Sequence, residues 1–238
     1  MGYISYLIYA LPVLILTLLA QWRVNSEYKK FSKIANSRHL TGAAAAQQIL
    51  KYYGVSDVRV AQIGGKLTDN YNPKDKTIYL SEGVYGSTSV AAVGIACHEA
   101  GHAAQHAENF VPNKIRTALV PITNFGSRFG LYIAIAGYLL SMVSVLMYNI
   151  SYYIIVVGLA LFGLSALFTL VTLPVEFNAS HRALKVIDET NLLEGSEYKG
   201  ARRVLTAAAM TYVAAFATSL VNLMYYASMF LGNRSRRR

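Results

Sequence analysis

The chain has 238 residues, of which 54% are hydrophobic and only 14% are charged, and its net charge is +10. This composition excludes an ordinary soluble domain and indicates a membrane protein. The single cysteine, Cys97, excludes an internal disulfide framework and a cysteine-rich zinc module. Any metal must therefore be held by histidine and carboxylate side chains.

Four windows without Asp, Glu, Lys or Arg are long enough to cross a hydrocarbon core, which takes about 20 apolar residues. The windows are Tyr3 to Gln21, Leu131 to Asn149, Tyr152 to Leu173 and Ala207 to Leu231. We predict a first transmembrane anchor over residues 1–26, a transmembrane hairpin over 129–173, and a fourth transmembrane helix with a basic tail over 207–238. The first window is expected to be a retained anchor, because no basic residue precedes it and no small-residue cleavage pattern follows it.

Basic residues gather beside these windows, and the positive-inside rule places them in the cytoplasm. They are Arg23, Lys29, Lys30, Lys33, Arg38, Lys114, Arg116, Arg128, Arg182, Lys185, Lys199, Arg202 and Arg203. Four spans would put the tail residues Arg234, Arg236, Arg237 and Arg238 on the opposite side, and this conflict disappears if residues 207–231 do not cross fully. The positive charge therefore indicates membrane topology, and no nucleic-acid partner is expected.

Residues 27–128 form the stretch large enough for a folded soluble domain. Thr41 caps a predicted helix over Gly42 to Leu50, which Gly54 ends. Strand character follows in the next part of this domain.

Strands are predicted over Val58 to Ile63 and over Thr77 to Leu80, separated by the turn-rich stretch Asp69 to Pro73. A small sheet is therefore expected. The strand at Thr77 to Leu80 is either an ordinary structural strand or one beside which an extended peptide substrate could add.

A helix is predicted from about Val90 to Ala107, with N-cap candidates at Ser87, Thr88 and Ser89. It contains His98-Glu99-Ala100-Gly101-His102. Helix positions four apart share one face and lie about 6 Å apart along the axis, so His98 and His102 can direct their imidazoles at one ion. Glu99 beside them can take a proton from an attacking water. The pattern is typical of zinc peptidases; two core-facing histidines bonded to neighbours are the alternative.

A catalytic zinc site needs a third protein ligand. His106 lies about 12 Å along the axis from His98 and cannot share its ion within a straight helix. A metzincin would have glycine and histidine where this chain has Gln105 and Glu108. Glu176 is the best candidate, because it begins the soluble segment 174–206 on the same side by topology and because a membrane-edge glutamate is otherwise costly.

Three stretches carry a resemblance to a known family. They are Asp69 to Pro73 with Thr77 to Tyr85, Ser89 to His106, and Leu173 to Ser180. These stretches resemble the YugP-type neutral zinc metallopeptidases of bacterial membranes, which look related to the HtpX-like and prenyl-protein-protease gluzincins. The similarity covers nearly the whole chain.

The resemblance implies one Zn²⁺ per chain, with Glu176 as the third ligand from a Glu-x-x-x-Asp pattern. Ser180 stands where the broader relatives have Asp, which implies a weaker partner for a ligand histidine.

No residue stands out as the group that would stabilise an oxyanion. The candidates for this role or for orienting a ligand are Ser180, His181, Arg182, Tyr198, Arg202 and Arg203. Asn178 is interpreted as a helix-surface residue, and Cys97 as a small core residue.

We therefore predict a mainly α membrane protein with four transmembrane helices and a small α+β zincin-like metallopeptidase domain at the cytoplasmic face of the cell membrane. It should hydrolyse membrane-associated peptides or proteins, and family analogy suggests membrane-protein quality control. The alternative is a catalytically inactive zinc-binding membrane scaffold. A transporter is disfavoured because the spans lack charged residues. The oligomeric state stays open.

Overall fold

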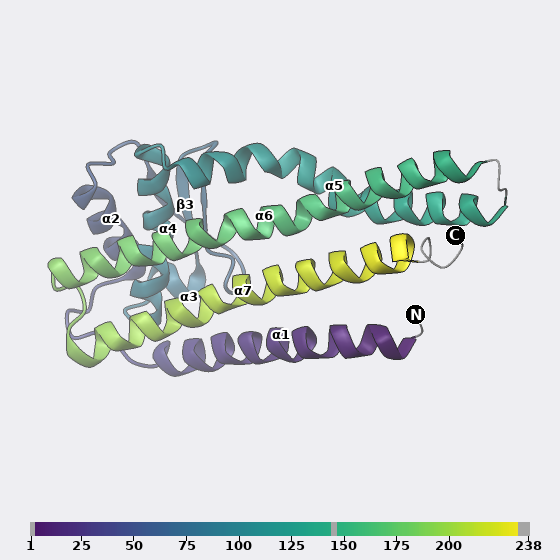
Figure 1. The fold of residues 1–238 in the computed structure, drawn as a ribbon. Helices are drawn as coiled ribbons and strands as arrows, with labels where there is room; N and C mark the ends of the chain where they lie inside the picture. Colours follow the sequence, from purple (N-terminus) through teal and green to yellow (C-terminus); the bar gives the residue numbers. More distant parts are fainter. Residues whose placement is uncertain (1–2, 144–146, 233–238) are drawn as a thin grey trace. The chain divides into compact units, whose positions relative to one another are not determined.

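The computed structural model describes residues 3–143 and 147–232. The predicted basic tail, with Arg234, Arg236, Arg237 and Arg238, lies outside the described residues. The elements, in chain order, are α1 (Tyr3–Phe31), α2 (Gly42–Tyr52), β1 (Arg59–Ile63), β2 (Asn70–Asn72), β3 (Thr77–Ser81), α3 (Glu82–Tyr85), α4 (Val90–Ala107), α5 (Val111–Val143), α6 (Tyr148–Glu189) and α7 (Gly195–Gly232) (Figure 1).

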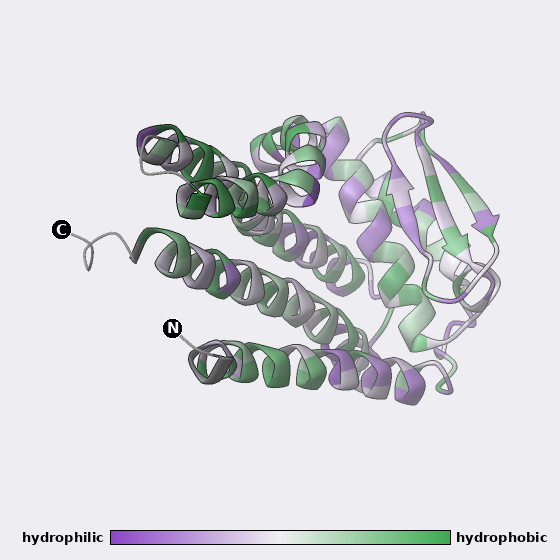
Figure 2. Ribbon diagram, turned by 90° about the vertical axis from the view of Figure 1, so that its right-hand side faces the viewer, coloured by the Kyte–Doolittle hydropathy of each residue, from purple (hydrophilic) through white to green (hydrophobic). Residues whose placement is uncertain are grey.

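Within the described residues, four helices, α1, α5, α6 and α7, are long and apolar enough to cross a membrane. Apolar residues predominate along much of these helices, whereas the sheet and its loops are more polar (Figure 2). The predicted fold class, a mainly α membrane protein with a small α+β part, is confirmed.

Three of these helices, α5, α6 and α7, extend well beyond the predicted spans, and α7 begins at Gly195. Helix α5 begins at Val111, and α6 continues through Pro174 to Glu189 without a break. Pro174 cannot donate a backbone hydrogen bond within the helix, yet it does not end α6. The predicted span and the predicted third metal ligand therefore belong to one continuous helix.

The described residues fall into two compact units. Of the described residues, the helical unit draws on 3–19, 115–143, 147–172 and 212–232, and the sheet unit comprises 20–114 and 173–211. These units are defined by contacts within the chain and not by a membrane, so the predicted boundaries between transmembrane and soluble segments remain predictions.

The sheet has three strands in the order β1-β3-β2. Strand β1 pairs with β3 in parallel from Arg59↔Thr77 to Ile63↔Ser81, and β2 pairs with β3 in an antiparallel sense. The sequence predicted β1 and β3, but the turn prediction over β2 was wrong. Asn, Asp and Pro are typical of turns, and pairing with a distant strand overrides that local preference here.

Strand β3 lies in the centre of the sheet, so the prediction that a peptide could add beside it was wrong. Both of its edges are occupied by neighbouring strands. Asp69, the residue directly before β2, also accepts a hydrogen bond at its carboxylate from the Ser81 backbone N–H at 2.7 Å. An incoming strand can pair only with a strand that has a free edge.

The core of the sheet unit lies where α2 packs against α4. Both predicted helices are present with caps: Thr41 accepts a hydrogen bond from Ala44 N–H, and Ser89 accepts one from Ala92 N–H. Cys97 is fully buried in this core, and burial raises the pKa of its thiol.

Helices α5 and α6 approach closely in the helical unit because glycines replace larger side chains at their contact. A Cβ atom at Gly130 would lie 2.5 Å from the backbone nitrogen of Phe162, and one at Gly158 would lie 2.7 Å from the carbonyl oxygen of Gly130. These neighbours are backbone atoms, which cannot move aside as a flexible side chain can. Small residues permit such close helix packing in membranes.

We expect Gly158→Val to destabilise the protein by about 1–3 kcal/mol, because the added side chain forces α5 and α6 apart. Thermal unfolding in detergent should show a lower midpoint. The matched control is Gly163→Ala on the same helix, where a Cβ would meet only the side chain of Leu223 at 3.3 Å. Equal midpoints for the two variants would show that this contact is not tight.

Candidate metal centre

Helix α4 presents two histidines on one face. His98 and His102 lie one turn apart, with their ring centroids separated by 4.7 Å. Both side chains are largely buried. This is the geometry that the His-Glu-x-x-His spacing predicts for a helix.

Glu176 of α6 comes to the same point. Its Oε2 lies 3.4 Å from His98 Nε2 and 3.5 Å from His102 Nε2, and the residue is only 2% exposed. One potential ligand atom from each of the three residues lies within 4.8 Å of the others. The structure therefore brings together the three residues predicted as metal ligands.

The donor set and its dimensions fit a zinc ion. Zinc binds imidazole nitrogen and carboxylate oxygen at about 2.0–2.2 Å, so two ligands of a tetrahedral ion lie roughly 3.3–3.5 Å apart. The distances from Glu176 Oε2 to the two Nε2 atoms agree with this separation. They exceed the usual length of an N–H···O hydrogen bond, about 2.7–3.2 Å, so direct hydrogen bonding explains them less well.

The approach of α6 to α4 depends on Gly101, between the two histidines. A Cβ atom at this position would lie 2.6 Å from the carbonyl oxygen of Ala179. Because that neighbour is backbone, any side chain at Gly101 would push α6 away. The small residue inside the motif thus has a packing role.

Glu99 is 9% exposed and lies on α4 directly after His98. Burial raises the pKa of its carboxyl, the two site histidines oppose this shift, and the carboxyl groups of Glu176 and Asp69 add to it. A carboxylate with a raised pKa is a better proton acceptor than one in water. Glu99 is therefore suited to accept a proton beside the histidines.

Each histidine is held at its Nδ1 atom by a different residue. Ser180 Oγ lies 3.1 Å from His98 Nδ1, so the serine at the expected Asp position does contact a site histidine. Gln105 Oε1 lies 3.1 Å from His102 Nδ1. This role of Gln105 was not predicted from the sequence. A polar residue one turn after His102 in a mainly apolar helix could have indicated a hydrogen-bond partner for the histidine.

Asn178 is half-buried on α6, and its side chain is hydrogen-bonded to neighbouring residues, which its interpretation as a helix-surface residue did not include. Its Oδ1 accepts hydrogen bonds from Gln105 Nε2 at 3.0 Å and from Arg182 Nε at 2.7 Å. Arg182 also pairs with Glu108 at 2.7 Å. Arg182 is thus part of a bonded chain that reaches His102 through Asn178 and Gln105.

The other oxyanion candidates lie in varied surroundings. His181 and Arg202 are exposed, and Tyr198 packs against the hydrophobic core. Arg203 donates hydrogen bonds to Glu27 of α1. No contact recorded among the described residues ties these four to the histidine pair, and their assignment remains a prediction.

His106 lies outside the group of potential ligands. Its Nδ1 is 2.9 Å from the hydroxyl oxygen of Tyr71 on β2. Burial raises the pKa of Tyr71 to about 12, with further contributions from the Asp57 and Asp75 carboxylates, so its phenol stays protonated. This contact links α4 to the edge strand of the sheet.

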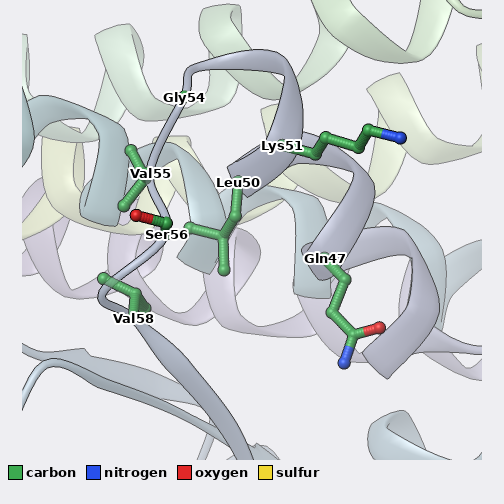
Figure 3. Close-up of a pocket in the computed structure, with 7 residues that line it drawn as sticks. All are labelled: Gln47, Leu50, Lys51, Gly54, Val55, Ser56 and Val58. Atoms are coloured by element: carbon green, nitrogen blue, oxygen red, sulfur yellow. The ribbon is translucent and has the colours of Figure 1, made fainter.

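A separate pocket of about 340 Å³ lies between the end of α2 and the loop that leads to β1 (Figure 3). Leu50, Val55 and Val58 supply apolar surface, and Lys51 supplies a cation. Its lining contains no histidine or carboxylate, so it offers no comparable metal or acid–base site.

Comparison with known proteins agrees with this geometry. Residues 6–231 match the sequence family described as "Putative neutral zinc metallopeptidase". The chain is also 39% identical over 215 residues to the "Putative membrane protease YugP" of Bacillus subtilis (strain 168), across 90% of this chain and 92% of that protein. No solved structure matches the chain.

The two matches each span almost the whole chain, and the family match includes both helices that carry the His-His-Glu group; the chain therefore belongs to this neutral zinc metallopeptidase family.

Proposed function

We propose that this protein is a zinc-dependent membrane endopeptidase, in which His98, His102 and Glu176 hold one Zn²⁺ per chain. The observation that carries the proposal is the convergence of these three side chains beside the buried carboxyl of Glu99. Membership of a zinc metallopeptidase family supports the metal and the reaction class. Bound zinc would polarise the substrate carbonyl and lower the pKa of water.

The other residues of the site transfer the proton and orient the two histidines. Glu99 accepts the proton of the attacking water and then donates it to the leaving amine, which makes it the general base and the general acid. Ser180 and Gln105 contact the Nδ1 atoms of the two histidines and leave the Nε2 atoms directed at Glu176. Such contacts hold ligand rings in place.

An extended peptide would bind along β2 in this proposal. Among the described strands, β2 pairs only with β3, and it packs against α4, the helix that bears the histidines. Its outer edge can offer backbone hydrogen bonds to a substrate strand.

Membrane proteins, unfolded segments or other membrane-associated peptides are the proposed substrates, and quality control is the proposed role. The four membrane-length helices and the membrane protease relative support this location. The basic residues beside the spans support a cytoplasmic face for the site. An inactive zinc-binding scaffold would keep the metal without cleavage.

We expect Glu99→Gln to abolish most cleavage while zinc content and unfolding temperature are retained, because the amide cannot accept the proton. The loss in kcat/KM should be about 10²- to 10⁴-fold. Proteolysis of casein and of a membrane-protein substrate measures it, with zinc determined by elemental analysis. The matched control is Glu194→Gln, on the exposed loop after α6. Unchanged cleavage in Glu99→Gln would contradict the proposed mechanism.

Glu176→Ala should lower the zinc content of the purified protein well below one ion per chain, since only two ligands remain. Elemental analysis after dialysis gives the result directly. Glu194→Ala serves as the control for removing a carboxylate elsewhere. Near-stoichiometric zinc in Glu176→Ala would rule out this residue as a ligand.

Cysteine labelling tests the proposed cytoplasmic face. Ser56→Cys introduces an exposed thiol in the loop before β1, and a membrane-impermeant maleimide should label it only after the cells are permeabilised. The unmodified chain is the control, because its buried Cys97, with a raised pKa, should not react. Labelling of Ser56→Cys in intact cells would place this loop outside.

A further inference from the structure

Gln105 is a fully buried polar residue that joins the two helices of the metal centre. Its Oε1 lies 3.1 Å from His102 Nδ1 on its own helix. Its Nε2 donates to Val175 O at 2.8 Å and to Asn178 Oδ1 at 3.0 Å, both on α6. The side chain therefore uses both amide hydrogens on one helix and its oxygen on the other.

The direction of this amide is determined by its partners. A backbone carbonyl can only accept a hydrogen bond, so the group that faces Val175 O must be the NH₂ of Gln105. The amide oxygen must then face His102 Nδ1, and because that oxygen only accepts, Nδ1 must carry the proton.

The hydrogen bonds of Asn178 and Arg182 independently require the same orientation of the Gln105 amide. Arg182 can only donate, so its Nε requires an oxygen at Asn178, and that oxygen in turn accepts from Gln105 Nε2. Arg182 is itself fixed by an ion pair with Glu108 at 2.7 Å and packs within 5.5 Å of the Tyr53 ring centre. A guanidinium, which can only donate, thus sets the direction of the hydrogen bonds in a chain that ends at His102.

His98 has no comparable constraint. Its Nδ1 contacts Ser180 Oγ, and a hydroxyl can rotate to donate or to accept. The two histidines therefore differ: His98 is restrained by a partner that fits either tautomer, and His102 by a partner that fits only one.

We propose that Gln105 is the positioning residue that holds His102 in the Nδ1–H tautomer with Nε2 free as a metal donor, and that Asn178 and Arg182 hold Gln105. This inference rests on the proposed zinc site, since Nε2 is the atom directed at Glu176. His102 then has the same tautomer in the metal-free protein and in the zinc-bound protein, so no proton has to move between its ring nitrogens when the ion binds.

The first test measures the tautomer of His102 in metal-free protein. Long-range ¹H–¹⁵N spectra of histidine-labelled protein in detergent, at mildly alkaline pH, identify the protonated nitrogen, and the signal is assigned by its loss in His102→Asn. We expect His102 as the Nδ1–H form in the unmodified chain and as a mixture in Gln105→Met. The Nε2–H form in the unmodified chain would overturn the proposal.

The second test measures zinc affinity by competition with a chelator. Gln105→Met keeps a similar volume and should weaken zinc binding about 10- to 100-fold. Gln48→Met, on the exposed face of α2, is the matched control and should bind as the unmodified chain does. Equal affinity and an unchanged tautomer in Gln105→Met would refute a positioning role.

Variants of Asn178 decide the question even if Gln105→Met fails to fold. Asn178→Asp keeps an oxygen acceptor for Gln105 and Arg182, so zinc affinity and tautomer should be retained. Asn178→Leu removes that acceptor and should weaken binding less than Gln105→Met, because Val175 O still directs the amide. Loss in Asn178→Asp with retention in Asn178→Leu would contradict the proposed chain.

The outcomes also separate this inference from the proposed function. If the unmodified chain shows the Nδ1–H tautomer but binds no zinc, the metallopeptidase proposal fails and the positioning of His102 stands. If the unmodified chain binds zinc and cleaves substrate while Gln105→Met has the same affinity and tautomer, only the positioning role fails.

Discussion

The close packing of α4 against α6 is the constraint on which the candidate metal centre depends. Gly101 lets the Ala179 backbone approach within a distance that no side chain permits. This contact brings Glu176 to the two histidines, Ser180 to the second nitrogen of His98, and the backbone carbonyl of Val175 to the Gln105 amide. A wider separation would break every one of these contacts together, because all of them cross the same helix pair.

Burial of polar groups makes this helix contact specific. Gln105 is fully enclosed, and an unpaired amide there would cost about 1–3 kcal/mol. Its three partners satisfy it only when α6 has one register along α4, since Val175 O and Asn178 Oδ1 must both be in reach. Apolar packing brings the helices together, and the polar bonds select the register.

Local sequence patterns predicted the features whose causes are local. The caps at Thr41 and Ser89, the helical His-Glu-x-x-His face and the four apolar helices follow from spacing and composition. The short strand β2 did not follow, because its turn-forming residues become a strand only by pairing with β3. For the same reason, the central position of β3 could not be read from its own five residues.

The sequence by itself determined the candidate ligand pair His98 and His102, the adjacent acid Glu99 and the membrane class, because helix periodicity and hydrophobic run length are properties of neighbouring residues. The candidacy of Glu176 needed topology and a family resemblance. Only the tertiary structure decided that Gln105, Asn178 and Arg182 form one bonded chain to His102. The bonds from Gln105 to Val175 and to Asn178 join residues 70 and 73 positions apart in the chain, and hydrogen bonds across such separations are made by packing, not by local pattern.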